Sequence, residues 1–184
     1  MNAAPDGVRR LVDRIEIEDL MVRYCRGIDR CDLELVKSAY HPDATEQHGP
    51  YSGNSLQIME EIVPMLEATY AAAQHHLTNM LIDIDGDQAR GETYFLAFQR
   101  QDLDDGTSLF EQYGGRYVDR FERRSGRWGI TERLVLMDWT RVGPSGDSWE
   151  GEATFPRSGV RDADPSAAVL PTHDLIARAS KELA

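Results

Sequence analysis

Apolar residues change their spacing once along this chain of 184 residues, from a helical period to a strand period. Over residues 8–29 they recur every three or four positions, which predicts a long amphipathic helix. A short helix follows, with Asp32 as its cap and Pro42 just after its end, and a third is expected over residues 55–73. Residues 41–54 are predicted to be a loop or an irregular strand.

After His76 the apolar residues alternate with polar ones, which is the period of a half-buried strand. Turn sequences at residues 85–87, 103–107 and 125–126 separate these segments, so the sequence predicts a meander of long antiparallel strands. Gly114-Gly115 inside one strand predicts a bulge or a bend. Helices followed by strands indicate an α+β fold, with the helices packed on one face of a curved sheet.

The composition shifts after residue 142, where the chain becomes rich in Gly, Ser, Pro and Asp. We therefore expect one domain over residues 1–142, a size that allows a well-buried core, and an extended tail over residues 143–184. The end of this tail is predicted to form a short helix, with Thr172 as its cap.

The net charge of −12 argues against partners that need a basic surface, namely nucleic acids and anionic membranes. No segment approaches the roughly 18 consecutive apolar residues of a membrane span, and the first residues lack the pattern of a signal peptide. Two cysteines, Cys25 and Cys31, are too few for a disulfide framework. A reducing, cytoplasmic setting is expected.

The first candidates for chemistry are Asp29 and two consecutive histidines, His75 and His76. Asp29 lies four residues after Cys25, beside the apolar face of the first helix, where a carboxylate is usually avoided. It is either a solvated acid at a helix end or a buried acceptor for a histidine. Because successive strand side chains point to opposite faces, at most one of the two histidines can face it. A carboxylate that accepts from the imidazole Nδ1–H would leave Nε2 available as a base.

Three segments together resemble the SnoaL-like branch of the nuclear-transport-factor-2-like superfamily: "YCRGIDRCDLELVKSAYHPDA", "HHLTNMLIDIDGDQARGETYF" and "GGRYVDRFERRSGRWGITERLVLMDW". The resemblance covers roughly residues 10–142. Within this branch the chain looks most like the hexachlorocyclohexane dehydrochlorinases, scytalone dehydratases and bile-acid 7α-dehydratases. The resemblance implies a cone-shaped α+β barrel, with a curved antiparallel sheet wrapped on N-terminal helices around a deep apolar pocket. It also implies elimination of water or HX by a His–Asp dyad without a cofactor.

The same resemblance assigns roles to individual residues. His75 matches the catalytic histidine four positions before an asparagine, here Asn79, and Asp29 matches the dyad acid. The expected catalytic residues are His75, Asp29, Arg133 and Tyr24. The residues expected to contact substrate are Cys25, Leu66, Tyr70, Tyr113, Tyr117 and Met137. Strand alternation places Arg133 on one face with Val135, Met137 and Trp139, and a cation among apolar groups needs an anionic partner or ligand.

These observations lead to the hypothesis of a cofactor-independent lyase, with no metal, that acts on a hydrophobic cyclic small molecule. His75 would remove a carbon-bound proton, Arg133 would assist the leaving group, and Tyr24 would bind a substrate oxygen. Glu46 makes one wall more polar than in the dehydrochlorinases, so their substrate cannot be carried over. Alternatives are a ketosteroid-isomerase-like enzyme, with Asp138 as a possible base, a polyketide-type cyclase, and a non-catalytic module like the dioxygenase small subunit. Leu134 and Leu136 on the outer face predict a homodimer or homotrimer.

Overall fold

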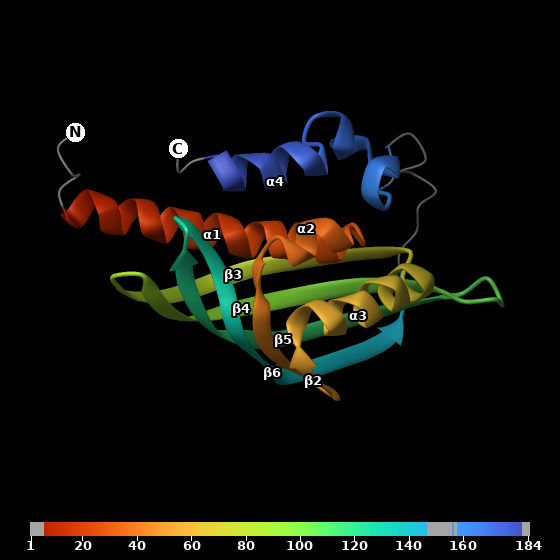
Figure 1. Cartoon of the computed structure of the whole chain (residues 1–184). Coiled ribbons are helices and arrows are strands. Elements are labelled where there is room, and N and C mark those ends of the chain that lie inside the picture. The colour runs from red at the N-terminus through yellow and green to blue at the C-terminus, as the bar shows by residue number, and fades with distance from the viewer. Residues whose placement is uncertain (1–5, 147–155, 157, 182–184) are drawn as a thin grey trace.

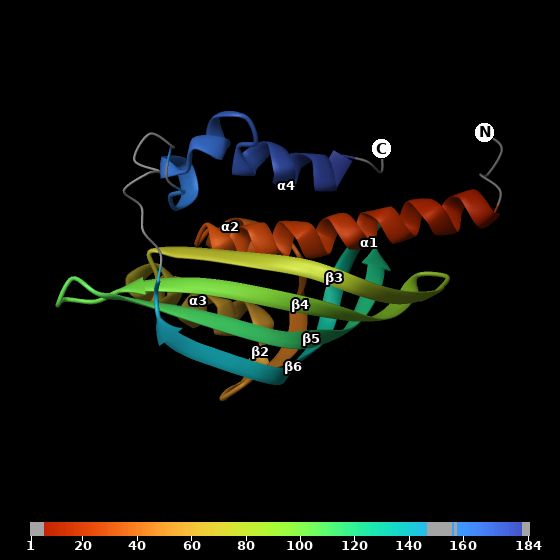
Figure 2. The same cartoon turned by 180° about the vertical axis from the view of Figure 1, so that it is seen from behind.

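The computed structural model describes residues 6–146, 156 and 158–181. Helices α1 (Asp6–Asp29), α2 (Leu33–Lys37) and α3 (Ser55–Thr69) lie on one side of a curved sheet (Figures 1 and 2). Its strands are β1 (Tyr40–His48), β2 (Tyr51–Asn54), β3 (Ala72–Asp85), β4 (Gln88–Asp102), β5 (Ser108–Arg124) and β6 (Arg127–Pro144). The predicted α+β fold is confirmed, and the side chain of Asp32 caps α2 by accepting from the Leu35 N–H at 3.1 Å.

The six strands follow the order β2-β1-β6-β5-β4-β3. The expectation of a wholly antiparallel sheet is corrected at one place, because β1 runs parallel to β6. Of residues 41–54, expected as a loop or an irregular strand, 41–48 lie in β1 and 51–54 lie in β2. The third helix is shorter than expected, since α3 ends at Thr69 and β3 begins at Ala72. The sheet is curved but does not close, because β2 and β3 form its two edges and each pairs with a strand on one side only.

Strand pairing defines rows of side chains across the inner face of the sheet, which faces the helices. One row joins His75, Ala97, Tyr113 and Thr140 on β3 to β6. The register of β5 and β6 shifts between Gly114 and Gly115, as the glycine pair predicts. Because this shift leaves Asp138 as an extra residue, Trp139 pairs with Gly114, whereas Met137 pairs with Gly115. The prediction that Trp139 shares the face of Arg133 is therefore wrong.

The core lies between α1 and the inner face of β4–β6. Ile17, Leu20, Met21 and Tyr24 of α1 are fully or almost fully buried there. They pack against aromatic and apolar side chains of the sheet, including Tyr40, Phe95, Tyr117, Phe121 and Ile130. This core holds the C-terminal end of α1 against β3, which is the edge strand that carries His75.

The described part of the tail is folded rather than extended. It forms two 3₁₀ turns, η2 (Arg161–Ala163) and η3 (Pro165–Ala168), and helix α4 (Thr172–Lys181), which lie above α1 and α2 in Figure 1. The closing helix exists, but Thr172 is already its first residue and donates its hydroxyl to Asp32 instead of acting as its cap. The prediction for residues 147–155 lies outside the described residues. Among the described helices, none is long and apolar enough to cross a bilayer.

Candidate active site

His75 and Asp29 meet at the point where the end of α1 crosses the start of β3. The imidazole Nδ1 lies 2.6 Å from Asp29 Oδ1, and the backbone N–H of His75 donates to Asp29 Oδ2 at 2.9 Å. Both oxygens of this carboxylate therefore bind the same residue, which fixes the orientation of the acid relative to the ring. The two side chains are 9% and 14% exposed, respectively.

This geometry decides the state of the imidazole ring. A carboxylate accepts hydrogen bonds only, so Nδ1 is the nitrogen that carries the proton in the contact with Asp29. Nε2 then keeps its lone pair in the neutral ring, and within the described residues it has no hydrogen-bond partner. His75 can therefore accept a proton at Nε2 while Asp29 stabilises the resulting imidazolium.

The neighbouring His76 points the other way. Its ring contacts Phe98 edge-on, with centroids 5.5 Å apart, on the outer face of the sheet. It pairs with Leu96 of β4, whereas His75 pairs with Ala97. Strand alternation therefore separates the two histidines, and the sequence expectation that at most one faces Asp29 is met by His75.

The surroundings of the dyad are apolar. Phe95 lies with its ring centroid 6.4 Å from that of His75 and stacks on Tyr117 at 4.5 Å. Cys25, one helical turn before Asp29, is 5% exposed. Burial, followed by the nearby charge of Asp29, raises the pKa of the Cys25 thiol to about 12. Cys25 is thus a neutral apolar contact rather than a nucleophile.

Arg133 forms a separate cluster in the core with Asp119. Its Nε and Nη2 donate to the two oxygens of Asp119 at 2.8 and 2.9 Å, and the two side chains are 0% and 1% exposed. The guanidinium carbon lies 4.2 Å from the ring centroid of Tyr24 and 4.3 Å from that of Tyr117. Burial acts to lower the pKa of Arg133, but the carboxylate of Asp119 and its hydrogen bonds outweigh this and raise it. Arg133 therefore stays a cation.

A third element of this cluster is Glu46, which pairs with Arg133 across β1 and β6. It accepts a hydrogen bond from Tyr40 Oη at 2.7 Å and lies 2.9 Å from Nδ1 of His48. Tyr40 Oη in turn lies 3.4 Å from Nη1 of Arg133. Glu46 was expected as a polar wall of the pocket, and it is instead a buried member of the hydrogen-bond network around Arg133.

The sheet register places this cluster further along β5 than the dyad. Asp119, the partner of Arg133, lies six residues from Tyr113, which shares the row of His75, a backbone span of about 20 Å. Side chains bridge this span, because Tyr117 lies over the guanidinium of Arg133 and stacks on Phe95, which lies beside His75. Cys25 is affected by the charges of both Asp29 and Arg133. Within the described residues no hydrogen bond joins Arg133 or Tyr24 to the dyad, and their action on the substrate beside His75 stays a prediction.

Two other predicted contact residues, Tyr113 and Tyr70, lie toward the same end of the sheet as His75. Tyr113 lies two strands away on the same row, about 10 Å at the usual strand spacing. Its hydroxyl and that of Tyr70, at the end of α3, both donate to Oε2 of Glu111, the latter at 2.9 Å. Burial and the hydrogen bond to Glu111 raise the pKa of Tyr113, so its hydroxyl stays protonated.

The remaining predicted contact residues also lie on the inner side of the fold. Met137 shares a row with Phe95 and Gly115 and is 50% exposed, and Leu66 of α3 packs against the core while partly buried. Tyr117 is buried between Phe95 and Tyr24. Met137 thus offers exposed apolar surface on this face of the sheet, whereas Tyr117 is enclosed by other side chains.

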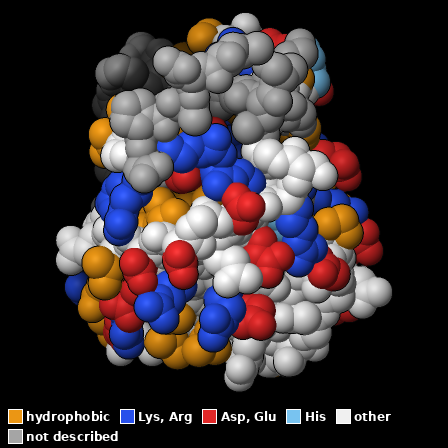
Figure 3. Space-filling model, turned by 60° about the vertical axis from the view of Figure 1, so that its left-hand side comes forward, with side chains coloured by type: hydrophobic (Ala, Val, Ile, Leu, Met, Phe, Trp, Pro, Cys, Tyr) orange, Lys and Arg blue, Asp and Glu red, His pale blue; other side chains and the backbone are white. Residues whose placement is uncertain are grey.

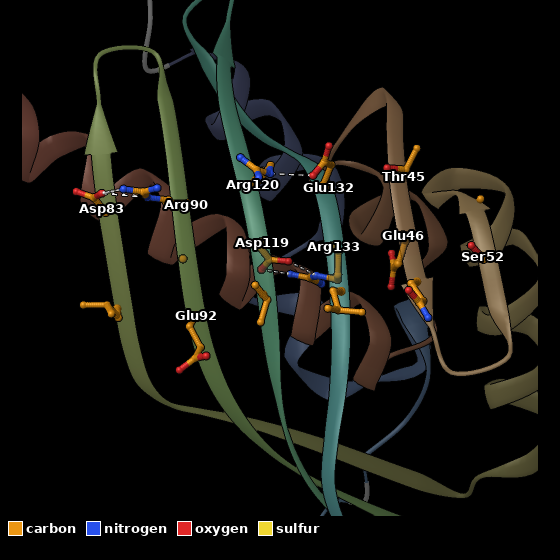
Figure 4. A pocket seen from close by; sticks show the side chains of 16 residues that line it. Thr45, Glu46, Ser52, Asp83, Arg90, Glu92, Asp119, Arg120, Glu132 and Arg133 are labelled. Carbon is orange, nitrogen blue, oxygen red and sulfur yellow. Dashed lines mark hydrogen bonds and ion pairs between the residues drawn. The ribbon is translucent and has the colours of Figure 1, made fainter.

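Two cavities of about 880 Å³ open at the surface, and neither is lined by His75 or Asp29. The first lies on the outer face, over a row made by Leu81, Val118 and Leu134, and Figure 4 shows two ion pairs beside it, Asp83–Arg90 and Arg120–Glu132. Charged side chains of both signs are also interspersed on the face seen in Figure 3. The second cavity is lined by His76, Phe98 and Phe110, together with Arg30 and Arg100.

The sequence interpretation missed three residues of this region: Asp119, Phe95 and Glu111. Asp119 could have been found, because it alternates with Tyr117 and Phe121 on a face that is otherwise aromatic. Asp138, considered as an alternative base, lies on the outer side and pairs with Arg116 at 3.1 Å. It does not face the dyad.

Comparison with solved structures finds the same fold in proteins of low sequence identity. A putative scytalone dehydratase from Novosphingobium aromaticivorans aligns with a TM-score of 0.65 at 19% identity, over 76% of this chain and 97% of its own. A type 2 hexachlorocyclohexane dehydrochlorinase aligns with a TM-score of 0.66 at 20% identity, over 84% and 100%. A protein of unknown function from Mycobacterium tuberculosis aligns with a TM-score of 0.62 at 19% identity, over 99% and 96%.

No curated protein matches the chain. The family model described as "SnoaL-like domain" matches residues 9–134, which include most of α1, the whole of β3 to β5 and the Arg133–Asp119 pair. This match covers well over half of the chain and agrees with the structural neighbours. The chain belongs to the SnoaL-like domain family.

Proposed function

We propose that this protein is a cofactor-independent lyase that removes a carbon-bound proton from a hydrophobic cyclic small molecule. The observation that carries the proposal is the contact of His75 Nδ1 with Asp29 at 2.6 Å, which leaves Nε2 as a base in apolar surroundings. Structural neighbours titled as a dehydratase and a dehydrochlorinase support the reaction class. Elimination of water or halide is therefore the expected reaction.

In the proposed reaction, Nε2 of His75 takes a proton from a carbon of the substrate. The electron pair of the broken C–H bond forms a double bond to the adjacent carbon, and the leaving group departs from that carbon with its own bonding pair. Asp29 stabilises the imidazolium during this step. Tyr113 and Tyr70, whose hydroxyl protons are donated to Glu111, are proposed to accept hydrogen bonds from substrate hydroxyl groups on the opposite side. Arg133 and Tyr24 support the site from the core by packing against Tyr117.

A second candidate is an isomerase that returns the same proton to another carbon. The observation that favours it is the engagement of Arg133 by Asp119, because no cation of the cluster is then available to stabilise a departing anion. Proton transfer between carbons needs the base but no leaving group. The two candidates therefore share His75 and differ in their product.

The test follows the proton rather than the product. Cyclic β-hydroxy ketones, steroid-like enones and halogenated rings are incubated with the protein in D₂O, and proton NMR follows loss of the signal at the acidic carbon together with any alkene or halide formed. We expect His75→Ala to slow this exchange by about 10²–10⁴-fold, the usual contribution of a general base. His76→Ala is the matched control, since that side chain contacts Phe98 on the other face, and it should retain full rate.

Full exchange in His75→Ala would exclude the dyad as the base. Exchange without elimination would favour the isomerase. An absence of exchange with every substrate class, in a protein whose dyad is intact by NMR, would favour a ligand-binding module instead.

A further inference from the structure

Helix α1, which carries Asp29, ends in an unusual way. The chain leaves the helix through Cys31, a non-glycine residue with φ of 51°. Helices usually end on glycine in this left-handed conformation, because a side chain adds roughly 1–2 kcal/mol of strain there. Local donors satisfy the last helical carbonyls, since the backbone N–H of Cys31 donates to the carbonyl of Ile28 and that of Asp32 to the carbonyl of Gly27. The carbonyls of Arg30 and Cys31, in the strained turn itself, take their donors from another part of the chain.

Those donors come from the tail. The backbone N–H of Arg161 donates to the carbonyl of Arg30 at 2.9 Å, and its Nε donates to the carbonyl of Cys31 at 3.2 Å. The guanidinium of Arg161 also pairs with Glu67 of α3. Arg161 thus stabilises the turn that follows α1, although it lies 130 residues further along the chain than Cys31.

A second tail residue controls the side chain next to Asp29. The Nε of Arg30 lies 3.0 Å from Oδ2 of Asp164. Asp164 is 5% exposed and also accepts from the backbone N–H groups of Gly159 at 2.9 Å and Ser166 at 3.0 Å. Burial would raise the pKa of Asp164, but these hydrogen bonds and the charge of Arg30 lower it to about 2. Asp164 is therefore a permanent anion that binds the guanidinium of Arg30.

The position of Arg30 gives this contact its importance. Arg30 follows Asp29 directly, and its side chain lies beside residues 71–74 at the start of β3, just before His75. A guanidinium in that place is a stronger partner for a carboxylate than an imidazole N–H is, because it offers two parallel donors and a full charge. The Nη1 of Arg30 also donates to the backbone carbonyl of Asp29 at 3.3 Å, so without Asp164 this guanidinium would be placed to compete with His75 for the Asp29 carboxylate.

We propose that Arg161 and Asp164 are positioning residues for the dyad, the first by holding the turn that directly follows Asp29 and the second by keeping Arg30 away from the Asp29 carboxylate. The importance of this arrangement for catalysis rests on the proposed function, whereas its effect on the His75–Asp29 contact does not. The alignment with the Mycobacterium tuberculosis protein over 99% of this chain extends through the tail.

The experiment measures the contact without any substrate. In the full-length ¹⁵N-labelled protein, long-range ¹H–¹⁵N NMR of the histidine rings reports which nitrogen of His75 carries the proton, and the exchange rate of the Nδ1 proton with water reports how well Asp29 holds it. The wild type should show the Nδ1–H form with a slowly exchanging proton. Asp164→Asn and Arg161→Ala should each lose part of this form and speed the exchange by at least tenfold.

Two further variants separate positioning from simple stability. Adding Arg30→Gln to Asp164→Asn should restore the wild-type signature, because the competing cation is gone. Thr172→Val removes a different tail contact, to Asp32, and should leave the signature unchanged. Unchanged His75 spectra in both Asp164→Asn and Arg161→Ala would overturn the proposal, whatever happens to their melting temperatures. Equal loss in Thr172→Val, or no restoration by Arg30→Gln, would overturn it as well.

These outcomes remain separable from those for the lyase itself. If the spectra change as expected while neither wild type nor variants exchange substrate protons, the proposed function fails and the positioning role stands. If activity exists, Asp164→Asn should lower kcat at least tenfold with little change in KM, and Arg30→Gln should recover it.

Discussion

The buried Arg133–Asp119 ion pair allows a quantitative prediction of how much one contact contributes to the free energy of unfolding. Asp119→Asn removes one charge while keeping the shape of the side chain. The guanidinium of Arg133 is 0% exposed, so water cannot replace the lost carboxylate. Removing one partner of a buried pair usually costs about 3–5 kcal/mol of the free energy of unfolding. We expect a value near 3 kcal/mol, because the tyrosine rings 4.2 and 4.3 Å away and the carboxylate of Glu46 still attract the cation.

Urea denaturation followed by fluorescence would measure this loss, with the slope m unchanged if the variant keeps the native fold. For a chain of this size, 3 kcal/mol corresponds to a fall in Tm of roughly 6–12 °C. The control lies at the next residue of each strand, where the ion pair Arg120–Glu132 is 68% and 62% exposed. Glu132→Gln should change stability by less than about 1 kcal/mol.

A double variant checks the physical reason. Asp119→Leu combined with Arg133→Met removes both charges and should be more stable than either single substitution, because no uncompensated ion remains buried. The reasoning is refuted if Asp119→Asn loses less than about 1 kcal/mol, since Arg133 would then have another acceptor of equal strength. It is also refuted if the double variant is no better than the worse of the single ones.

Two further predictions concern a thiol and a surface. Cys25, whose pKa is raised to about 12, should not react with Ellman's reagent at pH 8 in the native protein, because only roughly one thiol in 10⁴ is ionised. The thiol should react after the protein is unfolded in guanidinium. Fast reaction of the native protein would contradict the burial of Cys25. Light scattering should detect a homodimer or homotrimer of the wild type. Leu81→Arg, at a residue 72% exposed on the outer face, should convert it to a monomer, whereas Val22→Arg on α1 should not. A monomeric wild type would contradict this prediction.

The elements that the sequence predicts well are those with strong local signals. The helix ending at Asp29 and the hairpin turn at Gly86 follow from periodicity and turn chemistry, and both are present. Strand β1 was predicted only as one of two alternatives, a loop or an irregular strand, because its inward positions include Ala44 and Glu46 rather than large apolar residues. Glu46 is tolerated there only because Tyr40 and His48 bind its two oxygens, and such contacts cannot be deduced from the spacing of the sequence alone.

The position of the bulge between β5 and β6 could likewise be predicted only in part. Gly114-Gly115 predicts an irregularity in β5, and the structure shows why both residues are glycine. A Cβ at Gly114 would lie 2.2 Å from the Trp139 ring, and a Cβ at Gly115 would lie 2.2 Å from the Leu136 carbonyl. The sequence does not say which residue of the partner strand is extra, and one residue is enough to move Trp139 to the other face. The alternation of side chains along β6 therefore predicts the correct face for Arg133 and the wrong face for Trp139.

The tail had the least local signal, yet the first helix contains a hint of it. A helix that ends in a left-handed residue is expected to place glycine there, and the sequence has Cys31 instead. A residue with that strain indicates that other parts of the chain stabilise the turn. The sequence cannot identify those parts, because Arg161 is chosen by how the tail folds over α1 and not by its spacing from Cys31. The missing glycine is thus the one local sign that the acid of the dyad depends on a distant segment.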